Sequence, residues 1–240
     1  MHGTKVENFQ VVKKVYEEVG AIERKEEKIE LINGISNMLP YLREVSLNGL
    51  LKFSAFDTLN NEVENLTLWS HINEISNLTS LSIRDCDITD SILSKGVKGI
   101  LKIRTVDLSK NPRITTNGWN EISSKISQEN KLLHLVYQQG TISGASAQCL
   151  RDLFAYLTDL DLAECRFEGD SLQTLLGNME DPDEFSKLKI KRISLKYCSL
   201  TKLDQELIEA INDISGSPSL IIHDSQQSNK PTKCQCCFKI

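Results

Sequence analysis

The chain has 240 residues, of which 40% are apolar and 25% are charged, a composition typical of a globular protein that buries its own core. Its net charge of −5, with basic residues scattered among acidic ones, argues against nucleic-acid binding, which requires lysine and arginine clustered on one face. Without an apolar leader or an apolar run of membrane-spanning length, the sequence predicts a cytoplasmic protein whose seven cysteines are thiols.

Residues 1–40 predict a helical cap at the N-terminal end of the chain. Apolar residues recur at three- and four-residue intervals at Val6, Phe9, Val12, Tyr16 and Val19, and after Gly20 a second helical series runs through Ile22, Ile29, Ile32 and Ile35. The charged stretch ERKEEKIE is interpreted as a solvated helix face. The segment is interpreted as a cap that covers the exposed end of a core built from repeats, or as the remains of upstream repeats.

Residues 41–224 contain a repeated pattern in which apolar residues occupy the first, fourth and sixth positions, Cys or Asn the ninth and an apolar residue the eleventh. Clear copies are LTSLSIRDCDI from Leu78, LTDLDLAECRF from Leu157 and IKRISLKYCSL from Ile190. IRTVDLSKNPRI from Ile103 has Asn111 at the ninth position, and LLHLVYQQGTI from Leu132 has Gly140 there. Weaker copies put the fourth position at Val45, Leu66 and Leu220. The pattern predicts about seven or eight stacked units.

Each unit changes its apolar spacing from that of a strand to that of a helix. Ile88 is followed by Ile92, Leu93, Val97 and Ile100, and in LTDLDLAECRFEGDSLQTLL the change comes at Cys165. Stacked strand–turn–helix units predict an α/β solenoid in the shape of a horseshoe, with parallel strands on the concave face and helices on the convex face.

Residues 225–240 predict a flexible polar tail that ends in a cluster of three cysteines. Cys237 is fourth from the end, where a prenylated cysteine stands, and Cys234 and Cys236 are then candidates for palmitoylation. Lys239 is a poor residue for the second aliphatic position of a prenylation signal, so a tail with reactive thiols is the alternative. Membrane association is expected only if these cysteines are lipidated.

The repeat resembles the leucine-rich repeat superfamily, in particular the ribonuclease-inhibitor-like class with Asn or Cys at the ninth position. A side chain at this position can hydrogen-bond backbone groups where the chain leaves the strand. Cys86, Cys165 and Cys198 are therefore interpreted as structural residues rather than as metal ligands or nucleophiles.

Two segments, VDLSKNPRITTNGWNEI at 106–122 and SLQTLLGNMEDPDEFSKLKI at 171–190, resemble the C-terminal repeats of NLR-type innate immune receptors, the neuronal apoptosis inhibitory protein group. The resemblance implies a region that senses a partner and restrains a nucleotide-driven oligomerisation module. The sequence contains no phosphate-binding loop motif of the kind that module uses.

The third, fifth and seventh positions of each unit are expected to line the concave face, because they alternate with the apolar positions. From them we predict a partner-binding surface formed by Trp69, Arg84, Asp107, His134, Asp159, Asp161, Arg192 and Lys196. The mixed charge of this surface suits a protein partner, and we expect the chain itself to be a monomer. Ordinary packing within its repeat is the alternative role for Trp69.

No catalytic motif is present, and the carboxylates Asp159 and Asp161 lie on a face expected to be open to water. We therefore expect no catalytic residue, cofactor or metal. The sequence favours a non-enzymatic protein-binding module of an NLR-like innate immune protein. The alternatives are a repeat-only adaptor, of the ubiquitin-ligase or small-GTPase-regulator type, and a soluble inhibitor.

Overall fold

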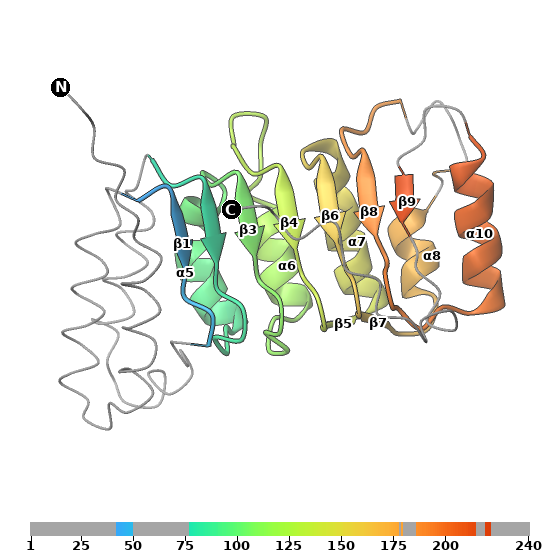
Figure 1. Cartoon of the computed structure of the whole chain (residues 1–240), viewed down its shortest axis with the longest axis horizontal. Coiled ribbons are helices and arrows are strands. Elements are labelled where there is room, and N and C mark those ends of the chain that lie inside the picture. Colours follow the sequence, from blue (N-terminus) through green and yellow to red (C-terminus); the bar gives the residue numbers. More distant parts are fainter. Residues whose placement is uncertain (1–41, 50–76, 178, 180–185, 215–218, 222–240) are drawn as a thin grey trace, which may run out of the picture.

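The computed structural model describes residues 42–49, 77–177, 179, 186–214 and 219–221 (Figure 1). Seven strands form one parallel sheet whose spatial order follows the chain, β1-β2-β3-β4-β6-β8-β9. The strands are β1 Glu44–Ser46, β2 Ser80–Ser82, β3 Thr105–Asp107, β4 His134–Val136, β6 Asp159–Asp161, β8 Arg192–Ser194 and β9 Ser219–Ile221. Two shorter strands, β5 Thr141–Ile142 and β7 Arg166–Phe167, pair with each other at the edge where the main strands end.

The register of the main sheet aligns the fourth position of every unit that has a described strand. Val45 lies opposite Leu81, Val106 opposite Leu135, and Leu160 opposite both Leu135 and Ile193. Leu81, Leu135 and Leu160 are each 1% exposed, so this row forms the floor of the core. The register predicted by the repeat is therefore confirmed for the described strands.

Strand β1 pairs directly with β2, and Val45 is the partner of Leu81. The expected copy around Leu66, Trp69, the N-terminal cap and the cysteine tail lie outside the described residues.

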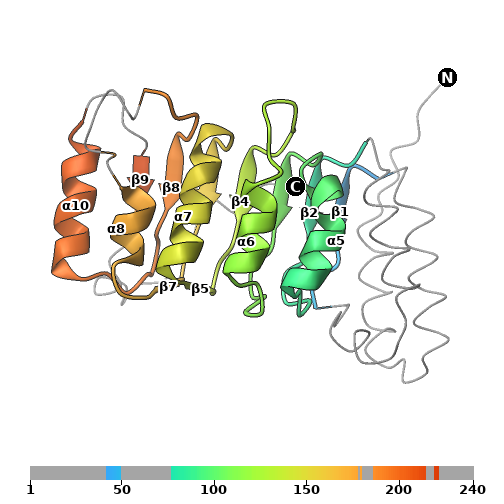
Figure 2. The same cartoon turned by 180° about the vertical axis from the view of Figure 1, so that it is seen from behind.

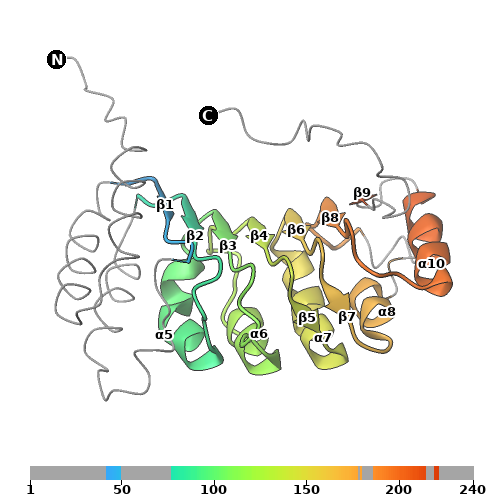
Figure 3. The same ribbon diagram turned by 60° about the horizontal axis from the view of Figure 1, so that its bottom comes forward.

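Helices cover one face of the sheet and leave the other open (Figures 1 and 2). They are α5 Asp90–Ile100, α6 Thr116–Ser123, α7 Gly144–Asp152, the 3-10 turn η2 Leu153–Ala155, α8 Ser171–Leu176 and α10 Lys202–Asn212. Seen from the end of the strands, the sheet follows a shallow inner arc and the helices an outer one (Figure 3). The chain thus forms the expected α/β leucine-rich repeat solenoid.

Helices α5, α6, α7 and α10 begin where a hydroxyl side chain caps their first turn. Thr89, Thr115, Ser143 and Thr201 each accept a hydrogen bond from a backbone N–H in the first turn of their helix. The Asp90 carboxylate also accepts from the amide of Thr115 at 2.7 Å, which joins the start of α5 to the cap of α6. The capping contacts therefore fix where a helix begins, and the Asp90–Thr115 contact also connects α5 to α6.

The ninth position of a unit is bonded to the unit before it. The thiols of Cys86, Cys165 and Cys198 donate to the carbonyl oxygens of the sixth residues of their preceding units, Leu47, Tyr137 and Leu162, at 3.0–3.2 Å. Burial raises the pKa of Cys165 to about 12 and that of Cys198 to about 11, which keeps both thiols protonated as donors at neutral pH. This geometry agrees with the structural interpretation of these cysteines.

The eighth position of six units has a left-handed backbone, with φ between 53° and 67°. The residues are Gly49, Asp85, Lys110, Gln139, Glu164 and Tyr197. A non-glycine residue in this conformation costs on the order of 1 kcal/mol. This conformation turns the chain out of the sheet while the residue keeps its backbone hydrogen bond to the next unit. The amide of Asp85, for example, donates to the carbonyl of Ser109 at 3.0 Å.

Gly140 occupies the ninth position because the neighbouring aromatic ring fills the space that a side chain would need. A Cβ atom on Gly140 would lie 2.2 Å from Cε1 of Tyr137. The Tyr137 ring is fully buried and packs edge-on against Trp119, with ring centroids 4.7 Å apart. Tyr137 stands where most other units have Leu or Ile, so the larger ring and the glycine go together.

We expect Gly140→Ala to lower the free energy of unfolding by about 1–3 kcal/mol, because the ring has no room to move. In a Tyr137→Leu background the same change should cost much less, and urea unfolding of the four proteins measures this coupling. Gly144→Ala is the control, since a Cβ atom there would meet nothing within 4 Å outside its own helix and chain neighbours. An equal cost of Gly140→Ala in both backgrounds would contradict the packing argument.

Candidate binding surface

The open face of the sheet is lined by side chains from the third, fifth and seventh positions of the units. On β2, β3, β4 and β6 the outer two residues are half-buried and the middle one is buried. Cross-strand register places Thr105, His134, Asp159 and Arg192 in one row. The expected alternation of core and surface positions therefore holds on the concave face.

Asp159 is the centre of one polar cluster on this face. Its Oδ2 atom lies 2.7 Å from Nδ1 of His134 and accepts from the Thr158 hydroxyl at 2.9 Å, while its Oδ1 pairs with the guanidinium of Arg192. Because a carboxylate only accepts, Nδ1 of His134 carries the hydrogen, which leaves Nε2 for another contact. Arg192 keeps 57% of its side chain exposed. The cluster thus brings together three of the predicted residues.

A second cluster runs across the ends of the strands. Arg84 donates from Nη1 to Oε1 of Gln138 at 3.0 Å, and Nε2 of Gln138 donates to Oδ2 of Asp161 at 2.8 Å. The other oxygen of Asp161 accepts from the backbone amide of Ala163 at 3.0 Å. Two predicted residues, Arg84 and Asp161, are therefore joined through Gln138, which was not among the predicted site residues.

Asp107 belongs to a third group nearer β1. Its Oδ1 accepts from the amide of Ser109 at 2.9 Å, and its Oδ2 lies 3.1 Å from the hydroxyl of Ser82. That hydroxyl is also 2.6 Å from Oδ1 of Asn48, and its single hydrogen can be given to one of the two oxygens. Asp107 and Asp161 thus use the same oxygen for the same task, which is to accept from the amide two residues later.

The acidic side chains of the concave face have more contacts within the chain than the basic ones. Asp107, Asp159 and Asp161 are each held by two or three contacts within the chain. Lys196 forms no ion pair within the described part of the chain, and Arg84 has one hydrogen bond from its five donors. The groups available to a partner are therefore mainly cationic donors.

Across the described residues, no group of three or more His, Cys, Asp or Glu side chains is placed to hold a metal ion. None of the described helices has the length and apolar character needed to cross a membrane.

Comparison with known proteins places one repeat in a described family. Residues 74–95 match a family model described as Leucine Rich repeat, over the copy that contains β2 and the start of α5. A search of curated proteins finds no match to the chain. Among solved structures, the chain is similar to one titled Leiomodin-1 Actin-Binding Site 2, with 19% identity and a TM-score of 0.41, over 66% of this chain and 91% of that one. The family match is consistent with a protein-binding repeat module.

We predict that Asp161→Ala lowers the free energy of unfolding by about 1–2 kcal/mol, because it leaves the Ala163 amide and the Gln138 side chain without their acceptor. Asp161→Asn keeps an acceptor oxygen and should cost less. Lys196→Ala should stay within about 0.5 kcal/mol of the parent protein. Urea unfolding measures all three, and an Asp161→Ala protein as stable as the parent would show that the carboxylate has no structural role.

Proposed function

We propose that the chain is a protein-binding module that captures a protein partner on its concave face. The observation that carries this proposal is the arrangement of that face, on which hydrogen-bonded clusters hold the outward-facing guanidinium groups of Arg84 and Arg192. Binding costs less side-chain entropy when the contacting groups are already ordered. Arginine is also among the residue types that most often anchor protein interfaces.

We further infer that the module is the sensor or regulatory region of an NLR-like innate immune protein. The support is the resemblance of residues 106–122 and 171–190 to the repeats of that receptor group. In such a protein the concave face would recognise a partner, and another region would carry the nucleotide-dependent assembly. A repeat-only adaptor and a soluble inhibitor remain the alternatives, because the same fold serves many roles.

Partner capture with matched variants tests the surface. Arg84→Gln with Lys196→Gln removes two concave cations, whereas Lys98→Gln with Lys202→Gln removes two exposed cations from helices α5 and α10. Proteins retained by the immobilised parent chain should fall about tenfold with the concave pair and stay unchanged with the helix pair, because interface energy is concentrated in few residues. Quantitative mass spectrometry of the retained proteins is the measurement.

Identical recovery of the same proteins by the parent and both double variants would overturn the concave-face assignment. The identity of the retained protein separates the roles. A nucleotide-binding assembly protein or its ligand supports the NLR-like role, a ubiquitin-ligase core or a small GTPase supports the adaptor, and one enzyme whose activity falls on binding supports the inhibitor.

A further inference from the structure

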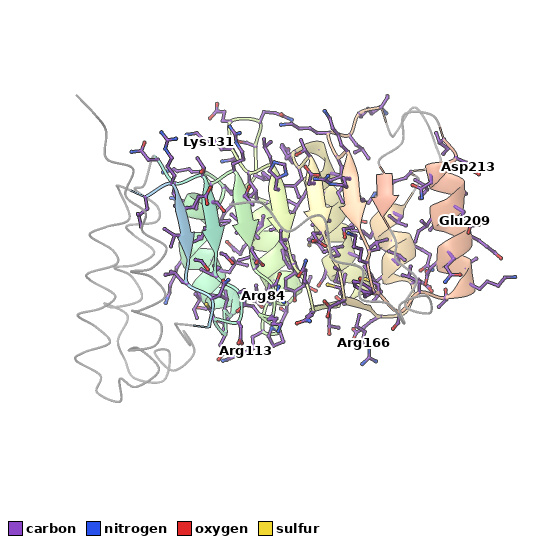
Figure 4. The ribbon with its side chains drawn as sticks, in the orientation of Figure 1. Arg84, Arg113, Lys131, Arg166, Glu209 and Asp213 are labelled. Atoms are coloured by element: carbon purple, nitrogen blue, oxygen red, sulfur yellow. The ribbon has the colours of Figure 1, made fainter. Side chains whose placement is uncertain are left out.

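One edge of the sheet carries cations that the concave clusters do not use. Arg104 and Lys191 stand at the second position of their units, just before β3 and β8, and Lys131 lies in the loop that leads to β4. Together with Arg192 at the start of β8 they form what we call the basic edge. All four side chains are exposed. Figure 4 shows Lys131 on this edge, with Arg113 and Arg166 on the opposite one.

These cations are largely unneutralised. Within the described part of the chain, Arg104, Lys131 and Lys191 form no ion pair, and Arg192 pairs with Asp159, which is shared with His134. Glu129 is exposed two residues before Lys131 and is the nearest carboxylate in sequence to that lysine. On the opposite edge, by contrast, Arg113 is paired with Asp87 at 3.5 Å.

The backbone fixes the spacing of the basic edge. The carbonyl of Arg104 accepts from the amides of Leu133 and His134, and the carbonyl of Thr158 accepts from those of Lys191 and Arg192. Adjacent strands are about 4.8 Å apart, so the three steps from β3 to β8 place Arg104 and Lys191 roughly 14 Å apart at their backbones. An extended peptide of about four or five residues spans this distance.

We propose that the basic edge binds an acidic polypeptide segment, extended across the starts of β3, β4, β6 and β8. This inference rests on the proposed protein-binding function and names the chemistry of the partner. Carboxylates at intervals of a few residues would meet Arg104, Lys131 and the Lys191–Arg192 pair in turn.

A peptide suits this edge better than a nucleic acid. Nucleic-acid surfaces combine phosphate-binding cations with exposed aromatic rings on which bases stack. Trp119 and Tyr137 are fully buried, and Tyr197, the exposed large aromatic residue of the described chain, follows β8 at the opposite edge. The net charge of −5 also repels a long polyanion that extends beyond the edge.

Fluorescence anisotropy of the full chain with a labelled peptide of alternating glutamate and glycine, twelve residues long, tests the proposal. The triple variant Arg104→Glu, Lys131→Glu, Lys191→Glu should weaken binding about tenfold or more, since each reversal replaces attraction by repulsion. The matched control Arg113→Glu, Arg166→Glu, Lys202→Glu makes the same change in net charge elsewhere and should bind within about twofold of the parent. Thermal melting by circular dichroism verifies that both variants are folded.

Equal weakening by both triple variants would overturn the proposal, because it would show that the attraction depends on net charge alone. Failure of the parent chain to bind the glutamate peptide more tightly than its glutamine counterpart would do the same. Tighter binding of a single-stranded oligonucleotide of equal length through the same cations would identify the wrong partner class. If the peptide fails while concave variants still lose their captured partner, this inference falls and the proposed function stands.

Discussion

The structure depends on how backbone N–H and C=O groups find hydrogen-bond partners where each unit leaves its strand. Between the sixth and seventh positions the backbone hydrogen bonds between neighbouring strands are interrupted, and side-chain groups bond to these backbone groups instead. The carbonyl of Leu47 receives the thiol of Cys86, while the amide of Arg84 donates to Oδ1 of Asn48 at 2.8 Å. Buried backbone groups without partners would each cost about 1–3 kcal/mol. Repeating this exchange in successive units lets the chain turn outward into a helix without losing the stack.

The same exchange decides what the concave face can offer. The amides of Ser109 and Ala163 are satisfied by Asp107 and Asp161, so these carboxylates serve the backbone of their own units. Asp159 is likewise shared between His134 and Arg192. With the acids engaged inside the chain, the arginines and lysines remain for other molecules. The engagement of these acids inside the chain therefore leaves mainly the cations of the concave face for contacts with other molecules.

The sequence alone predicts the parts of this fold that depend on apolar periodicity. Leu81, Leu135 and Leu160 predict both the strands and their register, because a buried row admits few other residue types. Residues at the eighth position give no such signal, since Lys110, Glu164 and Tyr197 adopt a left-handed turn that usually favours glycine. The engagement of Asp161 depends on Gln138, a neighbour in space but not in sequence.

Asn111 satisfies several of these backbone groups with one side chain. Its amide group donates to the carbonyls of Ile83 at 2.9 Å and Leu108 at 2.8 Å, and its oxygen accepts from the amides of Cys86 and Ile88. It thereby supplies the donor for Leu108 that Gly140, in the next unit, lacks. Urea unfolding of Asn111→Leu tests most directly whether these side-chain contacts to the backbone stabilise the stack of units. We expect the free energy of unfolding to fall by about 3 kcal/mol or more, and by less in Asn111→Cys, whose thiol can still donate to Ile83. An Asn111→Leu protein within about 0.5 kcal/mol of the parent would contradict it.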